Sequence, residues 1–218
     1  MYHQPAAYDC LTIFARFGAP LPHEENLRPC ELPDNLRSFP LPFPLEDLMT
    51  PRLALIAITP DLLAAECSGI SPFSDLLGCV IPPAWPPQHW EPHVFDILLA
   101  QFARYPEQTA WHRYVALPQP DGTRLLIGTL GAFWRPETPR ECEIGYSILP
   151  DWEGMGFATE GVRALLDLIR TDSSMSSVIA HTFPALKGSL RVMEKCGFSF
   201  DGPGEEAGTV RYRLRLGA

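Results

Sequence analysis

The segment GYSILPDWEGMGFATEG, residues 145–161, combines residue types that are suited to binding an anion. Glycines at positions 154 and 156 lack the Cβ atoms that would keep a ligand away from the backbone. Their amide groups can therefore point at a ligand together with the first turn of a helix that begins near Ala158. Because such amides lack intrahelical partners and carry the positive end of the helix dipole, the segment predicts a phosphate or pyrophosphate site. The alternative is a strand-to-helix turn that needs two glycines for its backbone alone.

Two other phosphate-binding motifs do not fit the sequence. A dinucleotide fingerprint needs a third glycine where Thr159 stands and an acidic residue about twenty positions later, where the chain has MSS at 175–177. A P-loop needs Gly-Lys followed by Ser or Thr, whereas residues 187–189 are Lys, Gly and Ser in that order. The sequence therefore argues against a hydride-transfer enzyme and against a nucleoside triphosphatase.

The overall charge of the chain limits its partners. Among 218 residues, 26 are acidic and 17 are basic, which gives a net charge of -9. This balance disfavours nucleic acid and anionic membrane surfaces, and it favours basic or amine-bearing substrates. The hydrophobic content of 46% is enough for a substantial core, but prolines and charges interrupt each apolar run before it reaches the length of a membrane span. We therefore expect a globular protein that partners neither nucleic acid nor a membrane.

The six cysteines are scattered along the chain. They are Cys10, Cys30, Cys67, Cys79, Cys142 and Cys196. None of their spacings resembles the short pairs of zinc sites, so we expect free thiols and no metal. The N-terminal MYHQPAAYDC has neither the basic region nor the long apolar run of a signal peptide. These features together predict a cytoplasmic protein.

The N-terminal part of the chain differs from the rest in its prolines. Of the 24 prolines, 16 precede residue 93, and residues 1–48 show no sustained helix or strand period. We interpret residues 1–48 as a proline-rich extension and residues 49–218 as the folded domain. Two roles stay open for the extension: packing on a neighbouring surface or on a second subunit in a homodimer, and a loose tail.

Regular elements are predicted from residue 50 onward. Alternating apolar residues predict strands, and apolar residues at helical spacing predict helices. We expect a strand over 50–59, a helix over 60–67, a loop over 71–92, a helix over 93–105, strands over 111–118, 123–134 and 141–149, a helix from 158, a strand over 177–183, a helix over 185–196 and a strand over 210–216. The strands over 111–118, 123–134 and 141–149 are expected to form an antiparallel meander, and the order as a whole predicts an α/β fold with a mixed central sheet flanked by helices.

Four strings in this order resemble the Gcn5-related N-acetyltransferase (GNAT) superfamily, in particular its ribosomal-protein N-acetyltransferase-like (RimJ/RimL-type) branch. They are TPRLAL with TPDLL, EIGYSILP, GMGFATEGVRALL and SLRVMEKCGF. The resemblance covers about residues 50–216. It implies the acyl-CoA N-acyltransferase fold, acetyl-CoA as cosubstrate and a primary amine as acceptor.

The resemblance also implies how the cofactor would bind. Its pyrophosphate would lie on the amides of residues 154–159, and its pantetheine arm beside the strand at 146–148 like an additional strand. The arm would enter where the strands at 145–148 and 178–183 separate, and a backbone N–H near Ile148 would receive the acetyl carbonyl oxygen. The residues implied to bind the cofactor are Tyr146, Ser147, Ile148, Gly154, Met155, Gly156, Phe157, Ala158, Thr159, Leu186 and Ser189.

Acetyl transfer to an amine needs a group that takes up a proton. An alkyl amine has a pKa of about 10 and is mostly protonated at pH 7. Glu143, at the start of the central strand, is the predicted general base, acting directly or through water. The alternative for Glu143 is an ordinary strand glutamate that pairs with an arginine. His181 on the neighbouring strand is the second candidate base, although a strand histidine is more often a packing residue.

Several positions depart from the pattern of the family. The tyrosine that often protonates the departing thiolate is replaced by Met193, and Ser189, one turn earlier, is the predicted catalytic donor in its place. Leu186 stands where an asparagine is common, and Glu153 stands where arginine or glutamine is frequent. The predicted function is N-acetyltransfer from acetyl-CoA to a protein N-terminus, a lysine or a small-molecule amine by direct attack in a ternary complex. The alternative is a GNAT-fold module that binds acyl-CoA or a protein without transfer.

The acceptor pocket is expected among variable loops, here residues 71–92 and 134–141. Trp85, Trp90 and Trp134 are candidate walls of this pocket. The alternative for these tryptophans is that they anchor the proline-rich loops.

Overall fold

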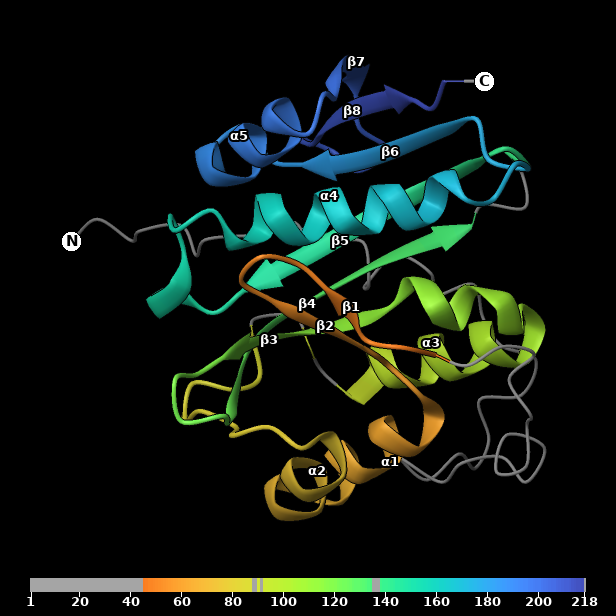
Figure 1. Cartoon of the computed structure of the whole chain (residues 1–218). Coiled ribbons are helices and arrows are strands. Elements are labelled where there is room, and N and C mark those ends of the chain that lie inside the picture. Colours follow the sequence, from red (N-terminus) through yellow and green to blue (C-terminus); the bar gives the residue numbers. More distant parts are fainter. Residues whose placement is uncertain (1–44, 88–89, 91, 135–137, 218) are drawn as a thin grey trace.

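An eight-stranded mixed sheet runs through the whole molecule (Figure 1). The computed structural model describes residues 45–87, 90, 92–134 and 138–217. The strands lie in the order β1-β2-β3-β4-β5-β6-β8-β7, and only β5 and β6 pair in parallel. They are β1 (Leu48–Met49), β2 (Ala54–Ala57), β3 (Arg113–Pro118), β4 (Arg124–Trp134), β5 (Glu141–Ile148), β6 (Ser177–Thr182), β7 (Ser199–Pro203) and β8 (Val210–Arg215). The predicted α/β fold with a mixed sheet and an antiparallel meander is confirmed.

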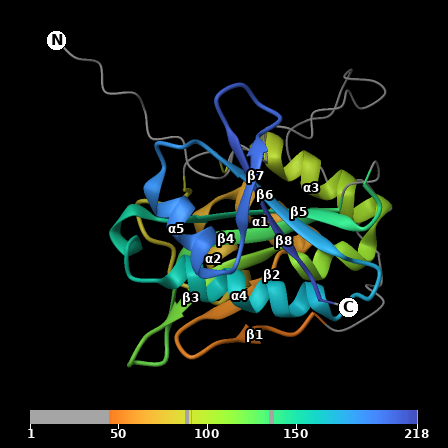
Figure 2. The same ribbon diagram turned by 90° about the horizontal axis from the view of Figure 1, so that it is seen from above.

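Helices cover both faces of this sheet. They are α1 (Pro60–Ser68), α2 (Ile70–Leu77), α3 (Pro92–Arg104), α4 (Phe157–Arg170) and α5 (Lys187–Lys195), with the short 3-10 helices η2 (Pro106–Trp111) and η3 (Pro150–Trp152). α4 and α5 pack on one face, and α1, α2 and α3 pack on the other. Figure 2 shows α4 and α3 on opposite sides of the sheet. Two hydrophobic clusters result, one on each face.

The central strand β5 separates the two clusters. Every residue of β5 is buried. Because successive side chains of a strand point to opposite faces, one alternate set packs under α4 and α5, namely Cys142, Ile144, Tyr146 and Ile148. α4 contributes Val162, Leu165, Leu166 and Ile169, which recur at the predicted helical spacing and are buried against that set. The polar residues of β5 consequently point to the opposite face.

Three predictions need correction or lie outside the described residues. The stretch 71–92 is not a loop throughout, because α2 covers Ile70–Leu77 and buries Phe73 and Leu77; its proline lies in the first turn, where a missing N–H costs little. Cys67 is disulfide-bonded, so the prediction of a free thiol is wrong there, whereas Cys79, Cys142 and Cys196 are free and buried. Residues 1–44 of the predicted extension 1–48 lie outside the described residues. The last residue of the extension, Leu48, is the first residue of β1.

A buried hydrogen-bond cluster ties the proline-rich loop to the sheet. The carboxylate of Glu66 on α1 accepts from the indole N–H of Trp85 at 2.7 Å and of Trp90 at 2.9 Å. Its other oxygen accepts from the hydroxyl of Tyr114 on β3 at 2.5 Å. Burial raises the pKa of Glu66 to about 7, against the opposing effect of the three donors. Trp85 and Trp90 are themselves buried, so they anchor the loop, as the alternative prediction had it.

We expect Glu66→Gln to change how stability depends on pH. Between pH 4.5 and about 7 the folded chain binds more protons at Glu66 than the unfolded chain, so folding stability falls as pH rises through this window. The loss is on the order of 2–3 kcal/mol. Glutamine keeps an acceptor for both indoles and a donor for Tyr114 without titrating. In urea unfolding from pH 5 to 8, the free energy of unfolding of Glu66→Gln should therefore increase relative to that of the wild type as pH rises. For the exposed control Glu194→Gln, we expect a profile of stability against pH that runs parallel to that of the wild type. A parallel profile for Glu66→Gln would contradict the prediction.

Candidate active site

The glycine-containing turn between η3 and α4 presents unpaired backbone amides. Gly154 and Gly156 have φ angles of 72° and 84°, a region that glycine adopts without a steric cost. Gly156 caps α4, with no side chain bonded to the free amides of the first turn. Within the described residues, the N–H groups of Gly154, Met155 and Gly156 donate to no acceptor either. This geometry gives the turn the anion-binding character that its sequence predicts.

Next to this turn, strands β5 and β6 separate. Their parallel pairing ends at Glu143 and Ile179, although β5 continues to Ile148. The N–H of Leu149 donates to the carbonyl of Ile127 at 2.8 Å, on the β4 side. Because backbone groups alternate between the two edges of a strand, the N–H groups of Ile148 and Tyr146 face the gap between β5 and β6. The resemblance placed this gap between the strands at 145–148 and 178–183. The gap lies there in the structure, except that β6 stays paired with β5 up to Ile179.

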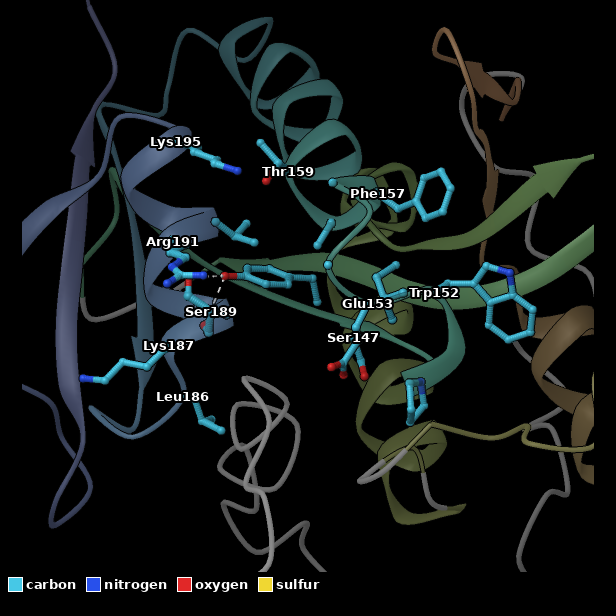
Figure 3. Close-up of a pocket in the computed structure, with 18 of the residues that line it drawn as sticks. Ser147, Trp152, Glu153, Phe157, Thr159, Leu186, Lys187, Ser189, Arg191 and Lys195 are labelled. Carbon is cyan, nitrogen blue, oxygen red and sulfur yellow. Dashed lines mark hydrogen bonds between the residues drawn. The ribbon is translucent and has the colours of Figure 1, made fainter.

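A pocket of about 610 Å³ joins the turn to this gap (Figure 3). Such a volume is typical of ligand sites, which span roughly 300–1,000 Å³. Of the eleven residues predicted to bind the cofactor, ten line the pocket: Tyr146, Ser147, Ile148, Gly154, Gly156, Phe157, Ala158, Thr159, Leu186 and Ser189. The eleventh, Met155, lies outside the lining and its side chain is exposed.

Helix α5 supplies positive charge to the pocket, which the sequence reasoning missed. Lys187, Arg191 and Lys195 all line it. They are spaced by four residues and so recur on one side of the helix. Figure 3 shows Arg191 and Lys195 on α5, across the pocket from Phe157 and the turn. The i, i+4, i+8 spacing was the available signal, because it places three cations on one stripe beside the resembling string SLRVMEKCGF.

Two hydroxyl groups meet inside the pocket. The Tyr146 hydroxyl lies 3.2 Å from Ser189 Oγ and 3.2 Å from the Ser189 carbonyl oxygen, to which it can donate. Met193, at the position where relatives often have a tyrosine, is completely buried in the core and does not line the pocket. The tyrosine on β5 is therefore an additional proton-bearing group, which the sequence reasoning treated only as a cofactor contact.

The predicted base Glu143 lies on the other face of β5. Its Oε1 is 2.5 Å from Nδ1 of His181 on β6, and both side chains are buried. The two candidate bases thus form one hydrogen-bonded pair at the point where the strands begin to separate. Neither residue lines the pocket. Ser147 points to the same face as Glu143, and its buried hydroxyl has no partner among the described residues.

Two positions that depart from the pattern of the resembling family, Leu186 and Glu153, both line the pocket. Leu186 lines the pocket as an apolar residue without a side-chain hydrogen bond to offer. Glu153 also lines the pocket but is exposed, so solvent screens its charge. Trp134 donates its indole N–H to the carbonyl of Pro139 and packs edge-on against Tyr105. Like Trp85 and Trp90, it therefore has a structural partner.

The described residues contain no cluster of three or more His, Cys, Asp or Glu side chains suited to a metal ion. In the same part of the chain, none of the helices has the length and apolar character needed to span a bilayer.

Comparisons with known proteins agree with this geometry. Residues 80–199, more than half of the chain, match the family model described as an acetyltransferase (GNAT) domain. The uncharacterized N-acetyltransferase YoaA of Bacillus subtilis (strain 168) is 32% identical over 80 residues, which cover 37% of this chain and 45% of that protein. The match therefore spans less than half the length of this curated relative.

Two solved structures share the fold at low sequence identity. The acetyltransferase from Agrobacterium tumefaciens str. C58 superposes with a TM-score of 0.54 at 21% identity, over 81% of this chain and 98% of that one. The microcin C7 self-immunity acetyltransferase MccE, solved in complex with acetyl-CoA and AMP, has a TM-score of 0.50 at 12% identity, over 77% and 94% of the two chains.

Proposed function

Because the chain belongs to the GNAT acetyltransferase family, we propose that it transfers an acetyl group from acetyl-CoA to a primary amine, and that the pocket between α4 and α5 binds the cofactor. Acetyl-CoA supplies an acetyl group that is activated as a thioester. One observation carries the proposal: a single pocket combines unpaired amides at a helix start, three cations and an open strand edge. The family relative MccE was solved with acetyl-CoA bound, which supports the choice of cofactor.

The residues present fit such a cofactor. The amides of residues 154–159 would hold the pyrophosphate, since they have no other acceptor in the described chain and lie at the positive end of α4. Arg191 and Lys195 would add favourable charge beside them. The free edge of β5 at Tyr146 and Ile148 would pair with the amide groups of the pantetheine arm, and the Ile148 N–H can donate to a carbonyl oxygen.

Acetyl transfer needs a group that accepts the proton of the amine and a group that donates a proton to the leaving sulfur. We assign the Glu143 carboxylate as the acceptor of the amine proton, directly or through water, with His181 Nδ1 holding Oε1 in place. We assign Ser189 Oγ, together with the Tyr146 hydroxyl at 3.2 Å, as the donor that serves the leaving sulfur. The resemblance to the ribosomal-protein branch implies a serine at this position, so Ser189 also supports the proposed kinship with that branch.

Direct transfer in a ternary complex is proposed because no described cysteine is suited to act as a nucleophile. Cys196 lies nearest to the turn, where its thiol donates to the carbonyl of Thr159 at 3.7 Å. Burial raises the pKa of the Cys196 thiol, which keeps it protonated and poorly reactive.

The function can be tested by calorimetric titration of the purified chain with acetyl-CoA, CoA and ATP. We expect saturable binding of the two CoA species and much weaker binding of ATP, since ATP has no pantetheine arm to pair with β5. A screen for thiol release with peptides, lysine derivatives and small amines would then identify the acceptor. Absence of CoA binding would contradict the proposal, and CoA binding without transfer to any amine would favour a binding module instead.

A further inference from the structure

An arginine far away in the sequence holds the turn between η3 and α4 from outside. Arg52 lies between β1 and β2, and its Nη1 donates to the carbonyl oxygen of Met155 at 2.9 Å. Its Nε donates to Glu160 Oε2 at 2.6 Å. The guanidinium carbon also lies 4.5 Å from the centre of the Phe157 ring. One side chain thus contacts three residues at or beside the amides of the proposed phosphate site.

Glu160 completes this contact from the first turn of α4. Its Oε1 accepts from the Thr50 hydroxyl at 2.6 Å and from the Arg52 backbone N–H at 2.8 Å. Partial burial would raise the pKa of Glu160, but the hydrogen bonds from Thr50 and Arg52 outweigh it and lower the pKa. The carboxylate therefore stays charged at neutral pH and joins α4 to the segment before β2. We call Thr50, Arg52 and Glu160 the clamp.

The bond to Met155 also sets the direction of an amide. In a trans peptide the C=O of one residue and the N–H of the next point in opposite directions. Since the Met155 carbonyl points out to Arg52, the N–H of Gly156 points away from Arg52. Gly156 lines the pocket and Met155 does not, which agrees with this orientation. The clamp thus fixes the plane of the peptide whose N–H is aimed inward.

A turn with two glycines needs such a constraint. Glycine loses more backbone freedom on ordering than any other residue, and a ligand that had to order the turn would bind with lower affinity. A contact made in the free protein removes that cost in advance.

We propose that Arg52, held by Glu160 and Thr50, is a positioning residue that pre-orders the amides at 154–157 for the pyrophosphate of the cofactor. The inference rests on the proposed function and adds to it a role for the string TPRLAL, which the acetyl-transfer chemistry does not use. Arg52 acts through the backbone of the turn, so its loss affects binding of the phosphate-bearing part of the ligand and leaves the acetyl-transfer step intact.

A direct contact between Arg52 and phosphate is the competing explanation, and Glu160 separates the two. Glu160→Gln weakens the clamp but leaves the arginine charge in place and removes a nearby negative charge. If Arg52 bound phosphate directly, Glu160→Gln would leave the affinity unchanged or raise it. If Arg52 positions the turn, Glu160→Gln lowers the affinity.

The experiment measures CoA binding by calorimetry for the wild type, Arg52→Ala, Glu160→Gln and Arg170→Ala. Arg170 is a matched control, because it is also an exposed arginine in a salt bridge, with Asp167, but at the other end of α4. We expect the Kd for CoA to rise about 10-fold in Arg52→Ala and about 3- to 10-fold in Glu160→Gln, with Arg170→Ala unchanged. In turnover, KM for acetyl-CoA should rise while kcat stays within about twofold, and kcat/KM with acetyl-pantetheine, which has no phosphate, should not change.

Hydrogen exchange provides a readout that is independent of the cofactor. The Glu160 N–H, which donates to the Gly156 carbonyl at 3.0 Å, should exchange faster in Arg52→Ala than in the wild type, while the amides in the middle of α4 exchange at the same rate. A wild-type chain that binds no CoA would overturn the proposed function, and unchanged exchange of the Glu160 N–H would overturn the clamp. An Arg52→Ala affinity within twofold of the wild type, or a tighter Glu160→Gln, would also overturn the clamp.

Discussion

Glu143→Gln is expected to lower kcat about 100- to 1,000-fold while leaving the Kd for acetyl-CoA within about twofold, as is usual for loss of a general base. Glutamine keeps the size of the side chain and an oxygen that can accept from His181 Nδ1, but it cannot take up a proton near neutral pH. The residue does not line the cofactor pocket, so binding should survive. Steady-state kinetics with the acceptor found in the amine screen, together with calorimetry, measure both quantities.

Two further variants decide which member of the pair is the base. Glu141→Gln is a matched control, because Glu141 lies on the same face of β5 two residues earlier and is paired with Arg213. It should keep kcat within about threefold of the wild type, since it is further from the gap. His181→Asn retains an N–H for Glu143 and should lose much less activity than Glu143→Gln. A larger loss in His181→Asn than in Glu143→Gln would instead assign the proton to His181.

The fold was largely predictable because its elements are encoded by local periodicity. The strand-helix-meander order, the buried stripe of α4 and the glycine turn all follow from patterns within about twenty residues. Neither β7 nor α2 was predicted, and α2 shows the limit of that reasoning. Its eight residues include two serines and a proline, and its stability comes from burying Phe73 and Leu77 against the sheet, which no local pattern reveals.

The candidate site was predictable in its backbone but not in its side-chain pairs. Spacing alone located the turn and the central strand, whereas the Glu143–His181 bond joins residues 38 positions apart on two strands. The Tyr146–Ser189 contact likewise depends on how α5 crosses β5. The sequence reasoning looked for an anion site without basic side chains, and so it did not connect the cations of α5 with the turn. Tertiary packing, which sequence periodicity does not specify, decides each of these pairs.

The cations of α5 lead to the second large effect. Arg191 and Lys195 line the pocket across from the amide turn, where a bound pyrophosphate would place at least two negative charges. Hydrogen bonds to charged groups contribute about 1.5–3 kcal/mol each, and exposed ion pairs about 0.2–1 kcal/mol. Because both side chains are exposed, their contribution lies towards the lower of these ranges.

Arg191→Ala/Lys195→Ala is therefore expected to raise the Kd for CoA about 30-fold at low salt, with a smaller difference at high salt because solvent ions screen exposed charges. Alanine favours a helix, so α5 should persist and the melting temperature should change little. Arg104→Ala/Arg170→Ala is the matched control, since it removes the same charge from residues outside the pocket. Calorimetry over a range of NaCl concentrations should show a flatter salt dependence for the α5 variant alone. If the two double variants weakened CoA binding equally, net charge would account for the effect, and the phosphates would have to lie on the amides without help from α5.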